Sequence, residues 1–208
     1  MIIKLYENNP NQRDINKIAD IIGNGGIAVI PTDTLYSLVC SIDFKNSVET
    51  IARLKGFSLK KARYSLLFDS MSRVSEYVRP MSRDLFSVLK QCLPGPFTFV
   101  MDANNNVPRN YQNPNKTIGI RMPDNGICRA IIETVGRPLI GTSVRTVNGE
   151  YETEYITDPE LIDELFGKHV DVVVDGGIGG VEPSTVVDCS NDQMELIRQG
   201  RGILPFEL

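Results

Sequence analysis

Residues 27–39 read IAVIPTDTLYSLV. The stretch begins after Gly25 and Gly26 as a short apolar run, which is typical of a buried β-strand. Pro31 cannot donate a backbone hydrogen bond to a sheet, so it predicts the end of that strand. The hydrogen-bonding side chains that follow it are those of Thr32, Asp33, Thr34, Tyr36 and Ser37. Because α/β folds commonly bind ligands in loops at strand ends, this loop is a candidate site.

Helical and strand patterns alternate along the rest of the chain. Residues 15–22 have helical spacing, and Ser82 is the expected N-cap of a later helix. A further helix begins either with a capping box of Thr157 and Glu160 or with Asp158 as N-cap before Pro159. The stretches 65–101 and 181–198 contain strands that do not fit regular β-α-β units. We therefore predict an α/β protein of mixed, α+β-type topology, with a twisted mixed sheet flanked by helices. Further strands are expected at residues 65–68, 97–101, 117–122, 138–143, 170–174, 183–188 and 195–198.

Length and composition are those of a globular protein. The 208 residues, 41% hydrophobic and 23% charged, predict one domain over residues 1–208. A net charge of -4 gives no overall signal for nucleic acid or membrane. Residues 50–68 nevertheless contain five basic residues and no acidic one. This run is either a solvated surface loop or a cradle for an anion.

The four cysteines are far apart and form no Cys-x-x-Cys pair. Their apolar neighbours predict buried free thiols in a reducing compartment. No segment approaches the ~20 apolar residues of a membrane span, and the N-terminus lacks the pattern of a signal peptide. We expect a cytoplasmic protein without a membrane partner.

Arg121 interrupts an apolar strand pattern. It either faces solvent at a sheet edge or is buried beside an anion, because an unpaired buried charge costs several kcal/mol. Other strand ends also carry hydroxyls and cations, with hardly a carboxylate and no histidine. Such groups bind anions rather than perform acid–base hydrolysis. The set comprises Thr32, Thr34, Lys55, Arg121, Thr142, Ser143, Ser184, Thr185 and Arg198, although for Thr142 alone a local backbone cap is the favoured interpretation.

Several short motifs occur in a characteristic order over nearly the whole chain. They are PTDTLYSL at 31–38, LL at 66–67, LPGPFT at 93–98, IGIRMP at 118–123, Ser143, STVVD at 184–188 and IRQG at 197–200. With this combination the chain resembles the YrdC/YciO family, whose better-known branch is threonylcarbamoyl-AMP synthase.

The resemblance implies a mixed sheet around an open, positively lined cavity. In the synthase branch this cavity joins L-threonine, bicarbonate and ATP into threonylcarbamoyl-AMP and pyrophosphate, for tRNA modification. It implies Mg²⁺ bound with the nucleotide and no metal site in the protein. Lys55, Ser143 and Arg198 would be catalytic, on the nucleotide side. The implied substrate-binding residues are Thr32, Thr34, Tyr36, Arg121, Thr142, Ser184 and Thr185.

Two positions depart from the synthase signature. Its Lys-x-Arg is here Lys55-Gly56-Phe57, and its Ser-x-Asn is Ser143-Val144-Arg145. Both changes resemble the YciO branch, whose role is less clear. Charge is available nearby for a nucleotide or RNA, but at a different geometry, from Lys60, Lys61, Arg63 and Arg145.

Three functions follow as alternatives. The first is a synthase-like nucleotidyltransferase with weak or altered activity. The second is a protein that binds tRNA or double-stranded RNA without efficient catalysis; the net charge of -4 weighs against it. The third is hydrolysis or salvage of an adenylated metabolite. The polar segment 146–157 is a candidate lid over any ligand.

Overall fold

The computed structural model describes residues 1–56, 64–145 and 155–206. In this part of the chain ten strands form one sheet. The strands are β1 (Ile2–Lys4), β2 (Ala28–Ile30), β3 (Ser37–Ser41), β4 (Ser65–Leu67), β5 (Phe97–Asp102), β6 (Thr117–Arg121), β7 (Leu139–Ser143), β8 (Val172–Asp175), β9 (Thr185–Asp188) and β10 (Glu195–Arg198).

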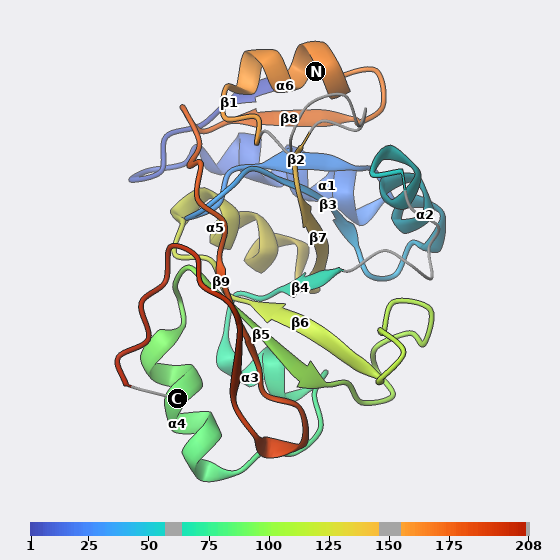
Figure 1. The fold of residues 1–208 in the computed structure, drawn as a ribbon. Helices are drawn as coiled ribbons and strands as arrows, with labels where there is room; N and C mark the ends of the chain where they lie inside the picture. Colours follow the sequence, from blue (N-terminus) through green and yellow to red (C-terminus); the bar gives the residue numbers. More distant parts are fainter. Residues whose placement is uncertain (57–63, 146–154, 207–208) are drawn as a thin grey trace.

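The sheet is mixed, as predicted. Its strand order is β1-β8-β2-β3-β7-β4-β6-β5-β9-β10. Among the described strands, five neighbouring pairs are antiparallel and four are parallel. Figure 1 shows the twist that accumulates along this order, from β1 and β8 at the top to β9 in the lower half.

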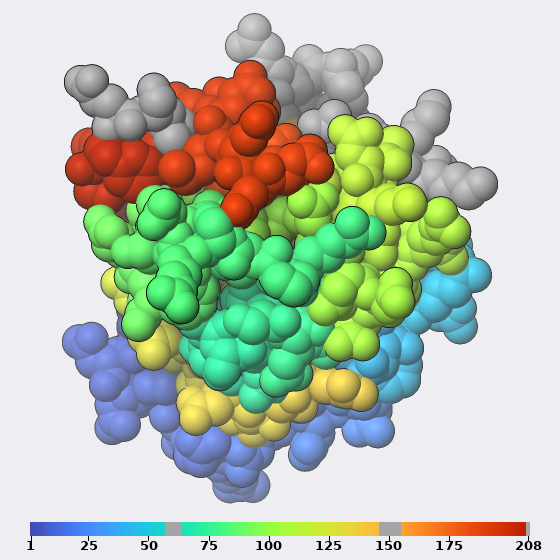
Figure 2. Space-filling model, turned by 90° about the horizontal axis from the view of Figure 1, so that it is seen from below, coloured from blue at the N-terminus to red at the C-terminus, as the bar shows by residue number. Residues whose placement is uncertain are grey.

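Six α-helices accompany the sheet in the described residues: α1 (Gln12–Gly23), α2 (Lys45–Leu54), α3 (Met71–Ser75), α4 (Arg83–Cys92), α5 (Gly126–Val135) and α6 (Pro159–Phe166). The predicted Ser82 cap is confirmed, and of the two alternatives at residues 157–158 the structure has Asp158 as the cap. The Ser82 hydroxyl accepts a hydrogen bond from the Leu85 amide at 3.2 Å, and the Asp158 carboxylate accepts one from the Glu160 amide at 2.9 Å. Figure 2 shows the segment after β9 (orange-red) beside α4 (green), where the Ser82 amide donates to Asp192.

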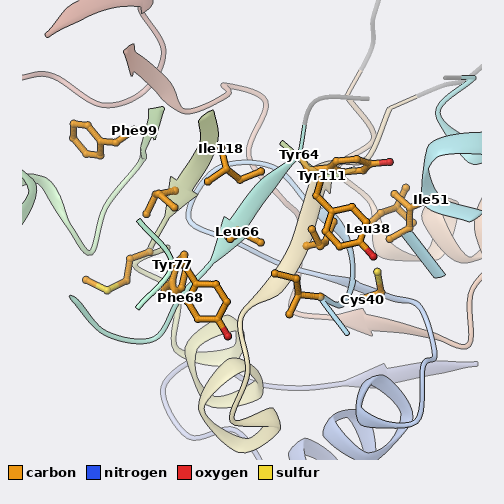
Figure 3. Packing of buried hydrophobic residues seen from close by; sticks show 14 of the residues in the cluster. Leu38, Cys40, Ile51, Tyr64, Leu66, Phe68, Tyr77, Phe99, Tyr111 and Ile118 are labelled. Carbon is orange, nitrogen blue, oxygen red and sulfur yellow. The ribbon is translucent and has the colours of Figure 1, made fainter. Parts of the chain in front are cut away.

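The sheet separates two hydrophobic clusters. The smaller one contains the apolar faces of α1 and α5, including Ile15, Ile18 and Ile131. The larger one lies under α2, α3, α4 and α6, and Figure 3 shows part of it. Burying each such Leu or Ile side chain stabilises the fold by about 1.5–3 kcal/mol. This rigid layer fixes the strand ends from which the polar side chains project.

The four cysteines are buried free thiols, as predicted. Burial raises the pKa of Cys40 and of Cys128 to about 12, so both stay protonated near neutral pH. No helix in the described ranges has the length and apolar composition needed to cross a membrane.

The stretch that opens the sequence contains two strands. β2 ends at Ile30 and β3 begins at Ser37, so residues 31–36 form the connection of an antiparallel pair. A second segment, residues 176–180, lies against this β2–β3 loop. The Gly180 amide donates to the Thr34 carbonyl at 2.9 Å, and the Tyr36 hydroxyl donates to the Gly177 carbonyl at 2.7 Å. β3 was not among the strands predicted from the sequence.

Close approach to the β2–β3 loop requires glycine at position 180. A Cβ atom there would overlap the Thr34 carbonyl oxygen, whereas one at Gly23 in α1 would meet no atom within 4 Å. We expect Gly180→Ala to lower the free energy of unfolding by about 1–3 kcal/mol in urea denaturation. The matched control Gly23→Ala should leave it unchanged or raise it by up to about 1 kcal/mol. Equal stability of the two variants would contradict this close packing.

Candidate functional site

Arg121, at the end of β6, is buried and paired with an acid. Its Nη2 donates to Asp33 Oδ1 at 3.0 Å and to Thr34 Oγ1 at 2.9 Å. The Arg121 and Asp33 side chains are only 11% and 8% exposed. Burial lowers the pKa of Arg121 and raises that of Asp33, while the opposite charge of each partner counteracts the shift. Of the two alternatives for Arg121, the structure has the buried cation with a partner.

A second group of polar side chains lies at the start of β9. Ser184 Oγ is 2.7 Å from Thr98 Oγ1 of β5, and Arg198 of β10 donates through Nη2 to the Ser184 carbonyl at 2.8 Å. Ser184 and Thr98 are both buried. The Arg198 guanidinium is thereby held beside Ser184.

A third group lies at the end of β7. Lys55, which follows α2, donates through Nζ to the Ser143 carbonyl at 2.6 Å. Burial, with the positive charge of Arg145 adding to it, lowers the pKa of Lys55 from 10.5 to about 7. The Lys55 amine is therefore only partly protonated near neutral pH, and a bound anion would favour its charged form.

The β2–β3 loop connects the three groups. Ser143 pairs with Ser37 across β7 and β3, and the Val144 amide donates to the Tyr36 carbonyl at 2.8 Å. From the other side, Arg201 Nη1 donates to the Asp33 carbonyl. Arg198 is also close enough for its charge to lower the pKa of Arg121.

Several predicted site residues have intramolecular partners. Thr32 Oγ1 donates to the Leu35 carbonyl at 2.7 Å and accepts from the Thr34 amide at 3.1 Å. The Tyr36 hydroxyl is occupied by the 176–177 backbone, and burial raises its pKa to about 12. These contacts brace the loop. The substrate-binding roles of Thr32 and Tyr36 remain predictions.

Thr185 and Thr142 support neighbouring segments. Thr185 is fully buried, and its Oγ1 donates to the Gly202 carbonyl at 2.6 Å and accepts from the Gly200 amide at 2.9 Å. It therefore holds residues 200–202 against β9. The Thr142 carbonyl accepts a hydrogen bond from Ser37 Oγ at 3.1 Å. Their substrate roles also remain predictions.

Part of the predicted site lies outside the described residues. This applies to Phe57, Lys60, Lys61 and Arg63, and to residues 146–154 of the proposed lid. The RNA-binding alternative depends on these lysines and arginines and so gains no support here. Arg145 is described; it forms an isolated antiparallel bridge with Tyr155.

Asp33 was predicted only as part of the polar loop and without a partner, and Thr98 and Arg201 were not predicted as site residues. The polar set was expected to contain hardly a carboxylate, whereas Asp33 lies at its centre. A signal was available, because a buried arginine requires an acid and Asp33 lies between two of the chosen threonines. Thr98 and Arg201 are recognisable only through their partners in the fold.

Surface hollows elsewhere do not coincide with these groups. One of about 690 Å³ is lined by α1 together with Met1, Gly26 and Asp171, and carries charges of both signs. The positively lined cavity implied by the resemblance remains a prediction.

Residues 1–56, 64–145 and 155–206 contain no cluster of three or more His, Cys, Asp or Glu side chains able to hold a metal ion.

Comparison with known proteins shows the family to which the chain is similar. The Sua5/YciO/YrdC family model, described as "Telomere recombination", matches residues 20–200. YciO of Escherichia coli K12 is 36% identical over 204 residues, which cover 97% of each chain. A threonylcarbamoyl-AMP synthase of Bos taurus is 30% identical over 87% of this chain and 70% of its own.

Two solved structures extend the similarity to the fold. The crystal structure of E. coli YciO has a TM-score of 0.89 at 32% identity, covering 99% of this chain and 98% of that one. Sua5 of P. abyssi complexed with L-threonine has a TM-score of 0.86 at 26% identity, covering 96% of this chain and 57% of that one. The motif order, the mixed sheet and these matches lead to one conclusion: the chain belongs to the Sua5/YciO/YrdC family.

Proposed function

We propose that the protein binds L-threonine and ATP and forms a threonylcarbamoyl adenylate, with activity altered by its departures at Phe57 and Arg145. The observation that carries the proposal is the buried Arg121 guanidinium. Its Nε is buried without a hydrogen-bond partner, and its Nη1 has none among the described residues. Buried polar groups are normally paired, so these donors suit a ligand carboxylate.

The surroundings of Arg121 suit a small amino acid. Thr34 and Ser184 present hydroxyls from the loop and from the residue before β9, and Arg198 and Arg201 add positive charge beside Ser184 and Asp33. A carboxylate binds favourably to such donors. The similarity to a Sua5 structure that contains L-threonine supports threonine as that amino acid.

The Lys55–Ser143 group suits the nucleotide. Lys55 and Arg145 supply positive charge at the end of β7, and Ser143 supplies a hydroxyl. Phosphate oxygens accept hydrogen bonds from all three side-chain types. Mg²⁺ would arrive bound to the phosphates, where it neutralises charge on the triphosphate.

The proposed reaction places few demands on a protein base. Threonine and bicarbonate give an N-carboxylate with loss of water. One of its oxygens then forms a bond to the α-phosphorus of ATP as the bond to pyrophosphate breaks. Charge neutralisation and alignment of the two reactants supply most of the acceleration, and the lysine, arginines and hydroxyls of this site are suited to both.

The proposal predicts pyrophosphate release that requires L-threonine, bicarbonate and ATP together. We expect release in a coupled assay at high enzyme concentration, and none when any one substrate is omitted. Arg121→Lys loses the planar guanidinium donors and should raise the half-saturating L-threonine concentration by about 10–100-fold. Absence of release, together with absence of ATP binding in calorimetry, would refute the proposal.

Nucleotide affinity should depend on the protonation of Lys55. Because its pKa lies at about 7, the charged fraction falls as pH rises through neutrality. We expect ATP affinity to fall about tenfold from pH 6 to pH 8 in calorimetry. Lys55→Arg keeps its charge over this range and should remove most of the decrease in ATP affinity. This control separates the titration of Lys55 from the titration of ATP itself. The same pH dependence in both proteins would exclude Lys55 as the cause.

The two departures should limit the rate. We expect the double variant Phe57→Arg/Arg145→Asn, which restores Lys-x-Arg and Ser-x-Asn, to raise pyrophosphate release about tenfold, the effect of one charge-assisted hydrogen bond in the transition state. The single variants serve as controls, since neither restores both features. No gain in the double variant would point to a substrate other than threonine.

A further inference from the structure

Asp33 is held at several points inside the site. Its Oδ1 accepts from Arg121 at 3.0 Å, its Oδ2 accepts from the Asp124 amide at 3.2 Å, and its carbonyl accepts from Arg201. The side chain is 8% exposed. A carboxylate buried to this extent is costly unless it is paired and hydrogen-bonded, and here it is both.

We propose that Asp33 is a positioning residue, which holds the Arg121 guanidinium in the single orientation that presents its Nε and Nη1 donors, neither of which has a partner among the described residues, to a ligand carboxylate. The nature of that ligand rests on the proposed function. The orientation of Arg121 does not, because it follows from contacts within the protein.

The geometry of the hydrogen bonds explains why one carboxylate, together with Thr34, is sufficient to orient the Arg121 guanidinium. Arg121 Nη2 uses its two hydrogens on Asp33 and Thr34, at 3.0 and 2.9 Å. A guanidinium is planar, so fixing both hydrogens of one nitrogen fixes the plane and the remaining donors. With Thr34 alone, the group would be free to turn about its Cδ–Nε bond.

The charge of Asp33 and its effect on the orientation of Arg121 predict opposite changes in carboxylate binding when Asp33 is removed. Its negative charge cancels that of Arg121, which leaves Arg198 and Arg201 as the nearby source of attraction for an anion. If charge alone mattered, removal of Asp33 would tighten binding of a carboxylate ligand. If Asp33 positions Arg121, the same removal weakens binding despite the added positive charge.

The first measurement needs no ligand. We would record ¹⁵N–¹H spectra of the arginine side chains, with Arg121 assigned by Arg121→Lys. In the wild type we expect resolved Arg121 Nε and Nη signals, and in Asp33→Asn averaged or broadened ones. The matched control is Asp124→Asn, since the Asp124 carboxylate is 69% exposed and only its amide contacts Asp33. Unchanged Arg121 signals in Asp33→Asn would overturn the proposal.

The second measurement is affinity for L-threonine and ATP in calorimetry. We expect Asp33→Asn to weaken L-threonine binding about tenfold and to leave ATP binding unchanged, with Asp124→Asn like the wild type. Tighter L-threonine binding in Asp33→Asn would overturn the proposal. If no protein binds L-threonine but Arg121 loses its order only in Asp33→Asn, positioning holds and the threonine assignment fails.

Asp33→Glu provides the test if Asp33→Asn does not fold. It keeps the charge but moves the carboxylate by one methylene. We expect shifted Arg121 signals and an L-threonine affinity lowered severalfold, although the net charge of the site is unchanged. Wild-type spectra and affinity in Asp33→Glu would show that the position of this carboxylate is unimportant.

Discussion

The pairing of Arg121 with Asp33 is the constraint on which the site depends. A guanidinium at the end of an apolar central strand needs an acid within reach, and only the β2–β3 loop supplies one among the described residues. The loop must then keep one conformation, and Thr32 and Tyr36 hold it through bonds to the Leu35 carbonyl and to residues 176–177. The hydroxyls of Thr32 and Tyr36, which the sequence predicts as ligand contacts, thus stabilise the loop whose Asp33 pairs with Arg121.

The twist of the sheet brings distant strands to this loop. β9 and β10 lie at the opposite end of the strand order from β1 and β8, yet Arg201 reaches the Asp33 carbonyl. The connection from β8 to β9 crosses the loop at Gly180 before it delivers Ser184. One twisted sheet therefore places side chains from both of its halves around a single point.

The sequence predicted much of the architecture and the chemical character of the site. Strong local signals were sufficient for the mixed sheet and the Ser82 cap, whereas for the cap at 157–158 and for Arg121 they left two alternatives that only the structure decides. β3 was missed because Ser37 was assigned to the polar loop, which left only the short apolar run Leu38–Cys40 to indicate a strand, and because a strand buried along its whole length shows no polar alternation. The pairing of Asp33 and the site roles of Thr98 and Arg201 were missed because the partners lie 86 or more residues away in the chain, so only the fold brings them together.

The contact from Arg201 to Asp33 spans 168 residues of sequence. Contacts of such separation form late in folding, because the entropy of closing a long loop must first be overcome. During synthesis, a chain that has emerged only as far as β8 lacks Ser184, Arg198 and Arg201 alike. Of the arginines around Asp33 such a chain has only Arg121, and the Arg121–Asp33 pair carries zero net charge. The last strands must therefore leave the ribosome before Arg198 and Arg201 can take their places beside this pair.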